Sequence, residues 1–568
     1  MGGSLGKPSV EKIYAAVDFG TVNTGFAIHL PNYPDVQVRL FENADRIPSI
    51  VLLDENKKFV AFGHTAKTQF CAMTKEEQDK HYFYQLYKLQ LVGSNMLSST
   101  ATIVDFSKKK SMKTLALFTI IFRHLTERSF QKLTDANMAN FKDNVNWIIT
   151  VPTIWSHSAR EFMRQAALNA GITENNVRLV LEPEAAALSS RQQLLNGKPK
   201  GFRYILADMG GGTVDICAHE LLGGGQIKEL CRSMGGCSGG KSVDNKFEAF
   251  MVSLFGGEVW TNLKEDHANI YMDIMNEFEE QKRQFSTATS VTVLRVEPVL
   301  LNLLRETNEG HNELQMVIPE TKYADSLTFN VETSRLTLTN SIMETFFNDS
   351  IEKVIVLIGE VVNECRSRKL PMNTLILACG YSESPYVREK IANEFAANYT
   401  VLQEPDPRNV VARGAVLIGK TEKNFIQRIA KVCYGMEQLE EFNGRKHKET
   451  YKRTIGDTSY CSRFGIVIRK GDLLTHGKTF SYISKYRKPG TTEFLHPRIV
   501  YLSEENNPSF CCEEGIVAKI DIGSPNSPGV DNHTLRYDVV VDDIELVFKI
   551  TNLTTHRLEG ITVRYLND

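Results

Sequence analysis

The chain has 568 residues, which is more than one hydrophobic core usually supports, so we expect two or more domains. Hydrophobic residues make up 42% and charged residues 24%, the ordinary range for soluble globular proteins, which leaves enough apolar surface for sizeable cores. The 66 basic and 68 acidic side chains nearly cancel, so the charge balance gives no argument for a nucleic-acid partner or a membrane surface.

Residues 1–12 are predicted to be a flexible N-terminus, and they lack the apolar core of a signal peptide. No apolar run is long enough to cross a bilayer, so we expect no membrane insertion. The ten cysteines include no Cys-x-x-Cys pair, which gives no indication of a zinc site or a thioredoxin-like motif. We therefore expect a cytoplasmic protein with reduced thiols.

Two stretches of the chain, which begin at Ile13 and at Tyr204, follow the same plan. Each has an apolar run that ends in an aspartate (Asp18 or Asp208), a glycine-containing turn, a second apolar run, another turn and an alternating third run. Such β-rich runs, punctuated by Gly and Asn, are typical of antiparallel hairpins. The repeat, about 190 residues apart, predicts two related lobes that each open with a hairpin.

The turns of these hairpins have the residues that a triphosphate site needs. Glycines in a tight turn let main-chain N–H groups approach an anion closely. An aspartate just before each turn would repel a bare phosphate unless a divalent cation lies between them. The pattern therefore favours two hairpins that hold a triphosphate from both sides through a hydrated magnesium. A plain turn is the alternative for either hairpin alone, whereas the pair together favours the phosphate site.

The motifs DFGTVNTG and DMGGGTVD resemble the two phosphate motifs of the actin–hexokinase–heat-shock superfamily. The segments VPTIWSHSAREFMRQAALNAG, VLEPEAAAL, LILACGYSESPYVREKI and DPRNVVARGAVLIG are similar, in the same order, to segments of the seventy-kilodalton heat-shock family. Within that family the chain most resembles the divergent heat-shock protein 12A/12B-like subfamily. The resemblance implies an α/β, actin-like (ribonuclease-H-like) nucleotide-binding domain of two lobes over residues 13–420, with ATP or ADP and Mg²⁺ as its ligands.

The resemblance also implies roles for individual residues. Asp18 and Asp208 would hold the hydrated magnesium, with Glu182 and Asp215 nearby, and Lys88 would promote the attack of water on the γ-phosphate. An exposed helix lysine is the alternative for Lys88. The residues expected at the nucleotide are Gly20, Thr21, Val22, Asn23, Gly210, Gly211, Gly212, Thr213, Gly239, Gly240, Lys241, Glu279, Lys282, Arg283, Ser286, Gly380 and Tyr381.

The adenosine end of the implied site has one match and one departure. In FEEQKRQFS, Glu279 and Lys282 share a helix face and can reach the ribose, while Arg283 lies against the base. A charged helix that merely faces solvent would have a similar sequence and is the alternative. In CGYSESP, Glu383 stands where the family has an arginine that stacks on adenine. A carboxylate cannot make that cation–π contact, so the affinity for the nucleotide and the selectivity for its base are left open.

The segment GGCSGGKS, residues 235–242, satisfies the Walker A pattern G-x-x-x-x-G-K-[ST]. A true P-loop follows a buried parallel strand, which is normally a near-continuous apolar run. The preceding ELCRSM carries Glu229 and Arg232 and follows a glycine-rich turn. We therefore interpret the segment as a third phosphate-facing turn, in which Lys241 adds a positive charge, and keep an independent P-loop as the minor alternative.

Alternating patterns dominate the last third of the chain, and residues 421–568 are predicted to form a β-rich, sandwich-like domain without a helical lid. The segments FGIVIRKGD, TFSYISKY, PRIVYLSEE, IVAKIDI, LRYDVVVDDIELVFKITNL and ITVRYLND are typical of strands. The resemblance implies a peptide-binding domain with an unidentified protein or peptide partner, although the usual acidic-hydrophobic linker is missing. A sandwich that binds another partner, or that packs only on the first domain, is an equal alternative.

Three functions are compatible with these features. The first is a chaperone-like protein that hydrolyses ATP slowly with magnesium and couples this to partner binding. The second is a nucleotide-regulated adaptor or scaffold with little or no ATPase activity. The third, a sugar or small-molecule kinase of the same superfamily, is disfavoured because the C-terminal strands would have no role in it. Whether the chain is an enzyme, and at best a weak ATPase, is left open by the sequence.

Overall fold

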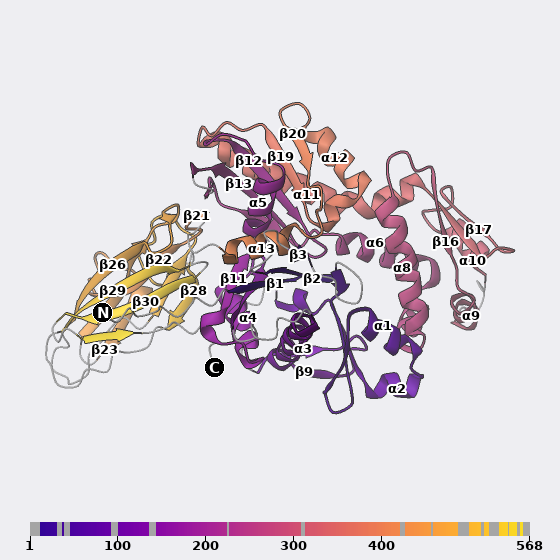
Figure 1. Cartoon of the computed structure of the whole chain (residues 1–568), viewed down its shortest axis with the longest axis horizontal. Helices are drawn as coiled ribbons and strands as arrows, with labels where there is room; N and C mark the ends of the chain where they lie inside the picture. Colours follow the sequence, from indigo (N-terminus) through magenta and orange to yellow (C-terminus); the bar gives the residue numbers. More distant parts are fainter. Residues whose placement is uncertain are drawn as a thin grey trace, which may run out of the picture.

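The described part of the chain is mixed α/β up to residue 420 and consists almost wholly of strands after residue 426 (Figure 1). The computed structural model describes residues 12–30, 37–38, 46–91, 100–135, 144–223, 226–307, 313–420, 426–455, 458–486, 499–512, 516–521, 533–542, 545–553 and 557–560. Of the N-terminus predicted to be flexible, only residue 12 lies inside these ranges. Within them, no helix combines the length and the apolar composition that a membrane crossing needs.

The first sheet is built around the first hairpin, and its strand order is β11-β10-β1-β2-β3, with β4 beside β2. β1 is antiparallel to β2 and parallel to β10, and β10 is parallel to β11. The strands are β1 (Ile13–Phe19), β2 (Asn23–His29), β3 (Gln37–Val38), β4 (Arg46–Pro48), β10 (Val145–Val151) and β11 (Val177–Leu181). β1, β10 and β11 are nearly continuous apolar runs, which is what strands covered on both faces require.

The second sheet is built around the second hairpin, and its order is β20-β19-β12-β13-β14-β21-β25, with β15 beside β13. The strands are β12 (Arg203–Met209), β13 (Val214–Leu221), β14 (Ile227–Glu229), β15 (Met234–Gly236), β19 (Thr374–Ala378), β20 (Thr400–Gln403), β21 (Ile426–Ile429) and β25 (Leu473–Leu474). β12 is antiparallel to β13 and parallel to β19, and β19 is parallel to β20. The first four strands thus repeat the directions found in the first sheet.

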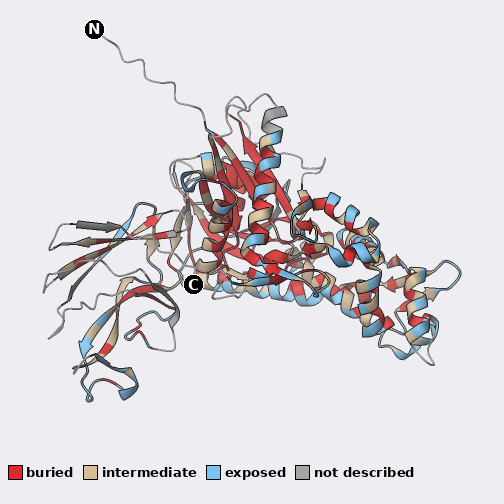
Figure 2. Ribbon diagram, turned by 90° about the horizontal axis from the view of Figure 1, so that it is seen from below, coloured by how far each residue is buried: buried red, intermediate tan, exposed pale blue. Residues whose placement is uncertain are grey.

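Two helices, α5 (Glu182–Gln193) and α13 (Val410–Lys420), lie between the two sheets. Ile148 of the first sheet and Leu206 of the second belong to one hydrophobic core together with both helices. Figure 2 shows buried residues throughout the middle of the mixed α/β part, and the layer of α5 and α13 is one of the cores there. α5 begins directly after β11, with Pro183 in its first turn, where the missing N–H of proline breaks no helix hydrogen bond. The two helices therefore pack against both sheets at once, and each sheet covers one side of the helix layer.

The outer faces of the two sheets carry separate cores. α3 (Thr114–Asp135) and α4 (His157–Asn169) pack on the first sheet. The helices that share a core with the second sheet include α6 (Lys241–Phe255), α8 (Ala268–Gln284), α11 (Asn340–Ser367) and α12 (Pro385–Phe395). The other described elements of this part are β5 (Ile50–Leu53), β6 (Phe59–Phe62), α1 (Gly63–Ala72), α2 (Lys75–Lys80), β7 (Tyr82–Gln85), η1 (Tyr87–Leu91), β8 (Thr102–Val104), β9 (Ser111–Lys113), η3 (Glu174–Asn176), α7 (Gly257–Asp266), β16 (Val291–Arg295), α9 (Pro298–Thr307), α10 (Leu314–Val317), η5 (Ile318–Glu320), β17 (Leu327–Asn330), β18 (Arg335–Thr339) and η6 (Gly380–Glu383). The predicted α/β class is confirmed.

The segment after α13 joins the second sheet to the C-terminal strands. β21 is parallel to β14 and antiparallel to β25, so it extends the second sheet by hydrogen bonds on both of its edges. Arg428 of β21 donates to Glu184 of α5, and the Ile429 amide donates to Glu229 of β14 at 2.9 Å. The connector that lacks the usual linker pattern is therefore a strand in its described part, whereas residues 421–425 lie outside the described ranges.

The C-terminal strands form two antiparallel sheets, ordered β23-β24-β22-β27-β28 and β26-β29-β30-β31. Their bounds are β22 (Cys433–Glu441), β23 (Lys452–Ile455), β24 (Thr458–Ile468), β26 (Thr479–Tyr486), β27 (Ile499–Ser503), β28 (Ile516–Asp521), β29 (His533–Asp542), β30 (Glu545–Asn552) and β31 (Arg557–Gly560), with the single turn η7 (Glu449–Tyr451). Met436 and Val500 of one sheet share a core with Tyr537 and Phe548 of the other. The strand predicted over residues 561–568 lies outside the described ranges.

The close packing of α13 on α5 makes a testable prediction. A Cβ atom at Gly414 would lie 1.7 Å from the backbone oxygen of Ala185, so Gly414→Ala forces the two helices apart. We expect a clear fall in the thermal midpoint, because overpacking a tight contact costs about 1–3 kcal/mol or more.

The matched control is Gly359→Ala in α11, where a Cβ atom would meet nothing within 4 Å. This substitution is expected to stabilise the protein by roughly 0.5–1 kcal/mol, because alanine has the higher helix propensity. Equal midpoints for the two variants would contradict the described packing of α5 and α13.

Candidate functional site

A cavity of about 310 Å³ lies where the turns of the two hairpins meet. Its lining comes from both sheets, from α5, α6, α8 and α13, and from the loops that precede α12 and α13. The lining residues are Asp18, Gly20, Thr21, Val22, Asn23, Arg46, Lys88, Glu182, Asp208, Gly210, Gly211, Gly212, Thr213, Gly240, Lys241, Asp244, Glu279, Lys282, Arg283, Cys379, Gly380, Tyr381, Glu383, Ser384, Arg408 and Val411.

All the residues that the sequence assigns to the site line this cavity except Asp215, Gly239 and Ser286. Asp215 is buried behind the second turn, where it accepts a hydrogen bond from Thr153. Gly239 supports the same turn, because a Cβ there would lie 2.4 Å from the Gly210 oxygen. The Ser286 amide donates to Thr289 Oγ1 at 3.1 Å in the turn after α8.

The two glycine-containing turns face each other at close range. A Cβ atom at Gly211 would lie 2.6 Å from Cγ2 of Val22, and one at Gly212 would lie 2.5 Å from Oγ1 of Thr21. Any side chain at these two glycines would therefore collide with the first turn. The third turn packs beside them, where the Lys241 amide donates to the Gly211 carbonyl at 2.7 Å.

Four buried carboxylates gather at this point, and each comes from an element end or a hairpin position. Asp18 and Asp208 lie near the ends of β1 and β12, Glu182 is the first residue of α5, and Asp215 faces Asp208 across the second hairpin. The Thr150 hydroxyl donates to Asp18 at 3.1 Å.

Burial disfavours the charged forms of Glu182, Asp208 and Asp215, and repulsion from neighbouring carboxylates adds to this effect at Glu182 and Asp208. Burial raises the pKa of Glu182 to about 7, although the ammonium of Lys88 acts in the opposite direction. Burial, followed by repulsion from Glu182, raises the pKa of Asp208 well above its ordinary value. Burial also raises the pKa of Asp215, against the effect of its hydrogen bond from Thr153. A cation placed among them would favour the ionised forms.

A hydrated magnesium fits this donor set. Oδ2 of Asp208 is buried and has no hydrogen-bond partner among the described residues, and a buried polar atom in that state is costly. Carboxylate oxygens are the ligands that magnesium prefers. Asp208 would hold the ion from the second sheet, and Asp18 would hold it from the first sheet.

Lys88 is buried rather than exposed, which contradicts the alternative of a solvent-facing helix lysine. It lies in η1, and its Nζ is 2.5 Å from Oε1 of Glu182 and 5.3 Å from the ring centroid of Trp155. The ammonium is therefore held in the cavity wall between a carboxylate and an aromatic face, both of which stabilise a cation.

Arg46 is the main residue that the sequence analysis missed. Its Nη1 lies 2.5 Å from Oδ2 of Asp18 and 2.5 Å from the carbonyl oxygen of Arg408, and its Nη2 donates to the Asn23 carbonyl at 2.8 Å. Burial alone would lower the pKa of Arg46, but Asp18 raises it above the ordinary value. A permanent cation thus occupies the carboxylate that the sequence assigns to magnesium.

The helix at the predicted ribose carries a compact ion-pair group. The Lys282 ammonium is 2.6 Å from Oδ1 of Asp244 and also contacts Glu279. Nε of Arg283 lies 2.7 Å from Glu279, and the Arg283 side chain is about half exposed (49%). Asp244, one turn into α6, is a further lining residue that the sequence analysis did not identify.

The loop before α12 departs most from the expected pattern. Cys379 has a φ of 64°, in the left-handed region where a side chain is unfavourable and glycine is preferred. Its buried thiol lines the cavity, and burial together with the nearby Asp208 raises its pKa well above the ordinary value. Glu383, at the predicted base, is paired with Arg408 at 2.7 Å.

Comparisons with known proteins identify the family of this chain. Residues 15–302 match the family model for the Hsp70 protein, and this stretch is just over half of the chain. The chain belongs to the Hsp70 family. The match includes both hairpins, η1, α5 and α8, so most of the lining residues fall within the family region.

Three relatives extend the similarity beyond the matched region. Heat shock 70 kDa protein 12A of Mus musculus is 23% identical over 628 aligned residues, which cover 98% of this chain and 92% of that protein. Heat shock 70 kDa protein 12B of Homo sapiens is 25% identical, with 77% of this chain and 72% of that protein covered. The chaperone protein DnaK of Picrophilus torridus is 24% identical over 74% of this chain. The predicted resemblance to the 12A/12B-like subfamily is confirmed.

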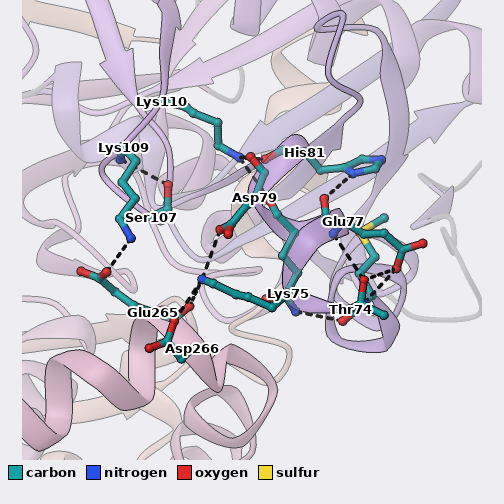
Figure 3. A network of polar contacts seen from close by, with 12 residues as sticks. Thr74, Lys75, Glu77, Asp79, His81, Ser107, Lys109, Lys110, Glu265 and Asp266 are labelled. Atoms are coloured by element: carbon teal, nitrogen blue, oxygen red, sulfur yellow. Dashed lines mark hydrogen bonds and ion pairs between the residues drawn. The ribbon is translucent and has the colours of Figure 1, made fainter.

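A network of polar contacts joins α2 and the turn between β8 and β9 to the end of α7 (Figure 3). Lys75 of α2 donates to the backbone carbonyl of Glu265 and lies 3.5 Å from the Asp266 carboxylate, both at the end of α7. Lys109, in the turn between β8 and β9, donates to the Glu265 carboxylate at 2.6 Å. We call these four residues the α2–α7 network. α8 follows α7 directly, so the network restrains the helix that lines the cavity.

The position of Arg46 predicts an effect on magnesium. In Arg46→Met, Asp18 loses its counter-charge and keeps only the hydrogen bond from Thr150, so the protein without ligands should be less stable. We expect the binding of ADP to the variant to depend more steeply on the magnesium concentration, as measured by calorimetry. Arg123→Met on the exposed face of α3 is the control. The same magnesium dependence in wild type and Arg46→Met would contradict a competition at Asp18.

The α2–α7 network makes a second prediction. Lys109→Glu and Glu265→Lys should each speed the release of bound nucleotide a few-fold. Each replaces the attraction between positions 109 and 265 with repulsion between like charges. The double variant Lys109→Glu with Glu265→Lys restores the pair and should return to the wild-type rate. Stopped-flow release of a fluorescent ADP checks this, and added salt should reduce the differences. A double variant as fast as the singles would show that the pair does not restrain the helices.

Proposed function

We propose that the chain binds ATP and magnesium between two related actin-like lobes within residues 13–420. The observation that carries the proposal is the cavity in which two glycine turns meet among buried carboxylates, with one unpartnered oxygen on Asp208. Backbone N–H groups in such turns suit phosphate oxygens, and the family match to an Hsp70 model supports the same ligand. Lys282 and its partners Asp244 and Glu279 would bind the ribose of the nucleotide.

We further propose slow hydrolysis of ATP in this cavity. Bound magnesium would neutralise charge on the phosphates. The chain's own contribution is to position groups: Glu182 holds the Lys88 ammonium at 2.5 Å, where it can orient a water molecule beside the terminal phosphate. Thr153 holds Asp215 behind the second turn, so that the turn keeps its place.

We propose that residues 421–568 form the part that contacts a protein or peptide partner, in the manner of a chaperone. The support is β21, which is hydrogen-bonded to the second sheet through β14 and to the C-terminal strands through β25. A change in the second sheet on nucleotide binding would act on both pairings. Arg428, paired with Glu184 in the central helix layer, gives a second route for that coupling.

The alternative is a nucleotide-regulated adaptor with little or no ATPase activity. The observation that favours it is Arg46, which already supplies a cation to Asp18 at 2.5 Å. A site that holds one carboxylate in a permanent ion pair has less capacity to bring magnesium to the phosphates. In this case the nucleotide would set the conformation of the protein without being consumed.

The experiment that tests the proposal compares wild type with Asp208→Asn. Calorimetry should show ATP binding that depends on magnesium and that falls by about 10- to 100-fold in the variant, the range for charge-assisted contacts. Magnesium-dependent release of phosphate, if present in wild type, should be lost in the variant. Asp208→Asn without ligands should be at least as stable as wild type, because it replaces an ionisable group whose charged form burial disfavours with a neutral group of the same size.

Asp273→Asn is the control, since Asp273 is exposed on α8 and does not line the cavity. No ATP binding by wild type would refute the nucleotide site. Binding without phosphate release would refute the ATPase and favour the adaptor.

A further inference from the structure

The residue at the predicted base position is not an isolated carboxylate. Nε of Arg408 lies 2.9 and 2.7 Å from the two carboxylate oxygens of Glu383. Both residues line the cavity, and their side chains are 50% and 27% exposed. The pair therefore places an arginine directly beside Glu383, from a segment 25 residues further along the chain.

Arg408 is also held through its backbone. Its carbonyl oxygen accepts from Nη1 of Arg46 at 2.5 Å, and the same Nη1 contacts Asp18. Val411, near the start of α13, is buried and lines the cavity as well. Arg408 is thus fixed at its side chain by Glu383 and at its main chain by Arg46, which limits the entropy that a ligand contact would cost.

The charges of the pair suit a base better than a phosphate. An unpaired Glu383 would repel a nucleotide, and its ion pair with Arg408 removes that repulsion. A guanidinium that is hydrogen-bonded in its own plane keeps its faces for an aromatic ring, which lysine cannot imitate. Arg283 lines the same cavity from α8, and its guanidinium is likewise bonded through Nε to a carboxylate, that of Glu279.

We infer that Arg408 is the base-contacting residue of this site, that Glu383 positions it, and that the ligand is a nucleotide whose aromatic base stacks on the guanidinium. This inference rests on the proposed nucleotide site and adds to it the residue that reads the base. Glu383 is then a positioning residue, because it acts on the base only through Arg408.

The test measures the binding of ATP and of inorganic tripolyphosphate, both with magnesium, by calorimetry. Arg408→Ala should weaken ATP binding by about three- to tenfold, the range for a half-exposed cation–π contact, and should leave tripolyphosphate unchanged. Arg408→Lys keeps the charge beside Glu383 but loses the planar face, so it should resemble Arg408→Ala. Arg388→Ala on α12, which does not line the cavity, is the matched control.

A second experiment exchanges the two residues at positions 383 and 408. Glu383→Arg alone places two arginines together and Arg408→Glu alone places two carboxylates together, so each single variant loses the ordered pair. The double variant restores the ion pair with the guanidinium at position 383, and it should recover most of the affinity for ATP. Tripolyphosphate again serves as the reference that has no base.

The outcomes separate this inference from the proposed function. No binding of either ligand to wild type refutes the nucleotide site itself. Binding of ATP that is equal in wild type, Arg408→Ala and Arg408→Lys overturns the inference and leaves the nucleotide site in place. A parallel loss of ATP and tripolyphosphate in Arg408→Ala also overturns it, because the residue would then act on the phosphate end through Arg46.

Discussion

The concentration of negative charge between the two hairpins is the constraint on which the rest of the structure depends. Asp18, Glu182, Asp208 and Asp215 are all buried, and carboxylates in that state must be protonated, paired or bound to a cation. Lys88 forms an ion pair with Glu182, and threonine hydroxyls donate hydrogen bonds to Asp18 and Asp215. Among these four, Asp208 is the one with a fully buried oxygen that has no hydrogen-bond partner among the described residues. The site is therefore organised around a positive charge that the side chains supply only in part.

The scaffold explains why these carboxylates can meet. Each hairpin has an aspartate next to the last residue of its first strand, and the shared helix layer of α5 and α13 sets the distance between the two sheets. Gly414 allows the two helices to touch, and Gly211 allows the two turns to touch. These close contacts fix how far apart the two sheets and their turns lie. A small change in the contact between the helices would therefore alter the spacing of the carboxylates.

The sequence was sufficient where the signal was local. The hairpins, their aspartates and the glycine turns follow from short patterns, and the polar segment ELCRSM was the reason for the prediction that the third turn is not a P-loop. The local patterns could not predict contacts between residues that are far apart in the sequence. Arg46 and Arg408 are 362 residues apart and meet only through the fold. The letters FYQLYKLQL likewise do not show that Lys88 is enclosed by Glu182, because burial depends on neighbours that the local pattern does not contain.

The pairing of β21 has a consequence for protease sensitivity. A protease binds its substrate as an extended segment that has left its own structure, so cleavage inside a paired strand requires local opening. Arg428 is a trypsin site whose backbone is paired opposite Leu474, and its guanidinium is bound to Glu184. The rate of cutting at this residue therefore reports, on the unlabelled chain, how often the C-terminal strands detach from the second sheet.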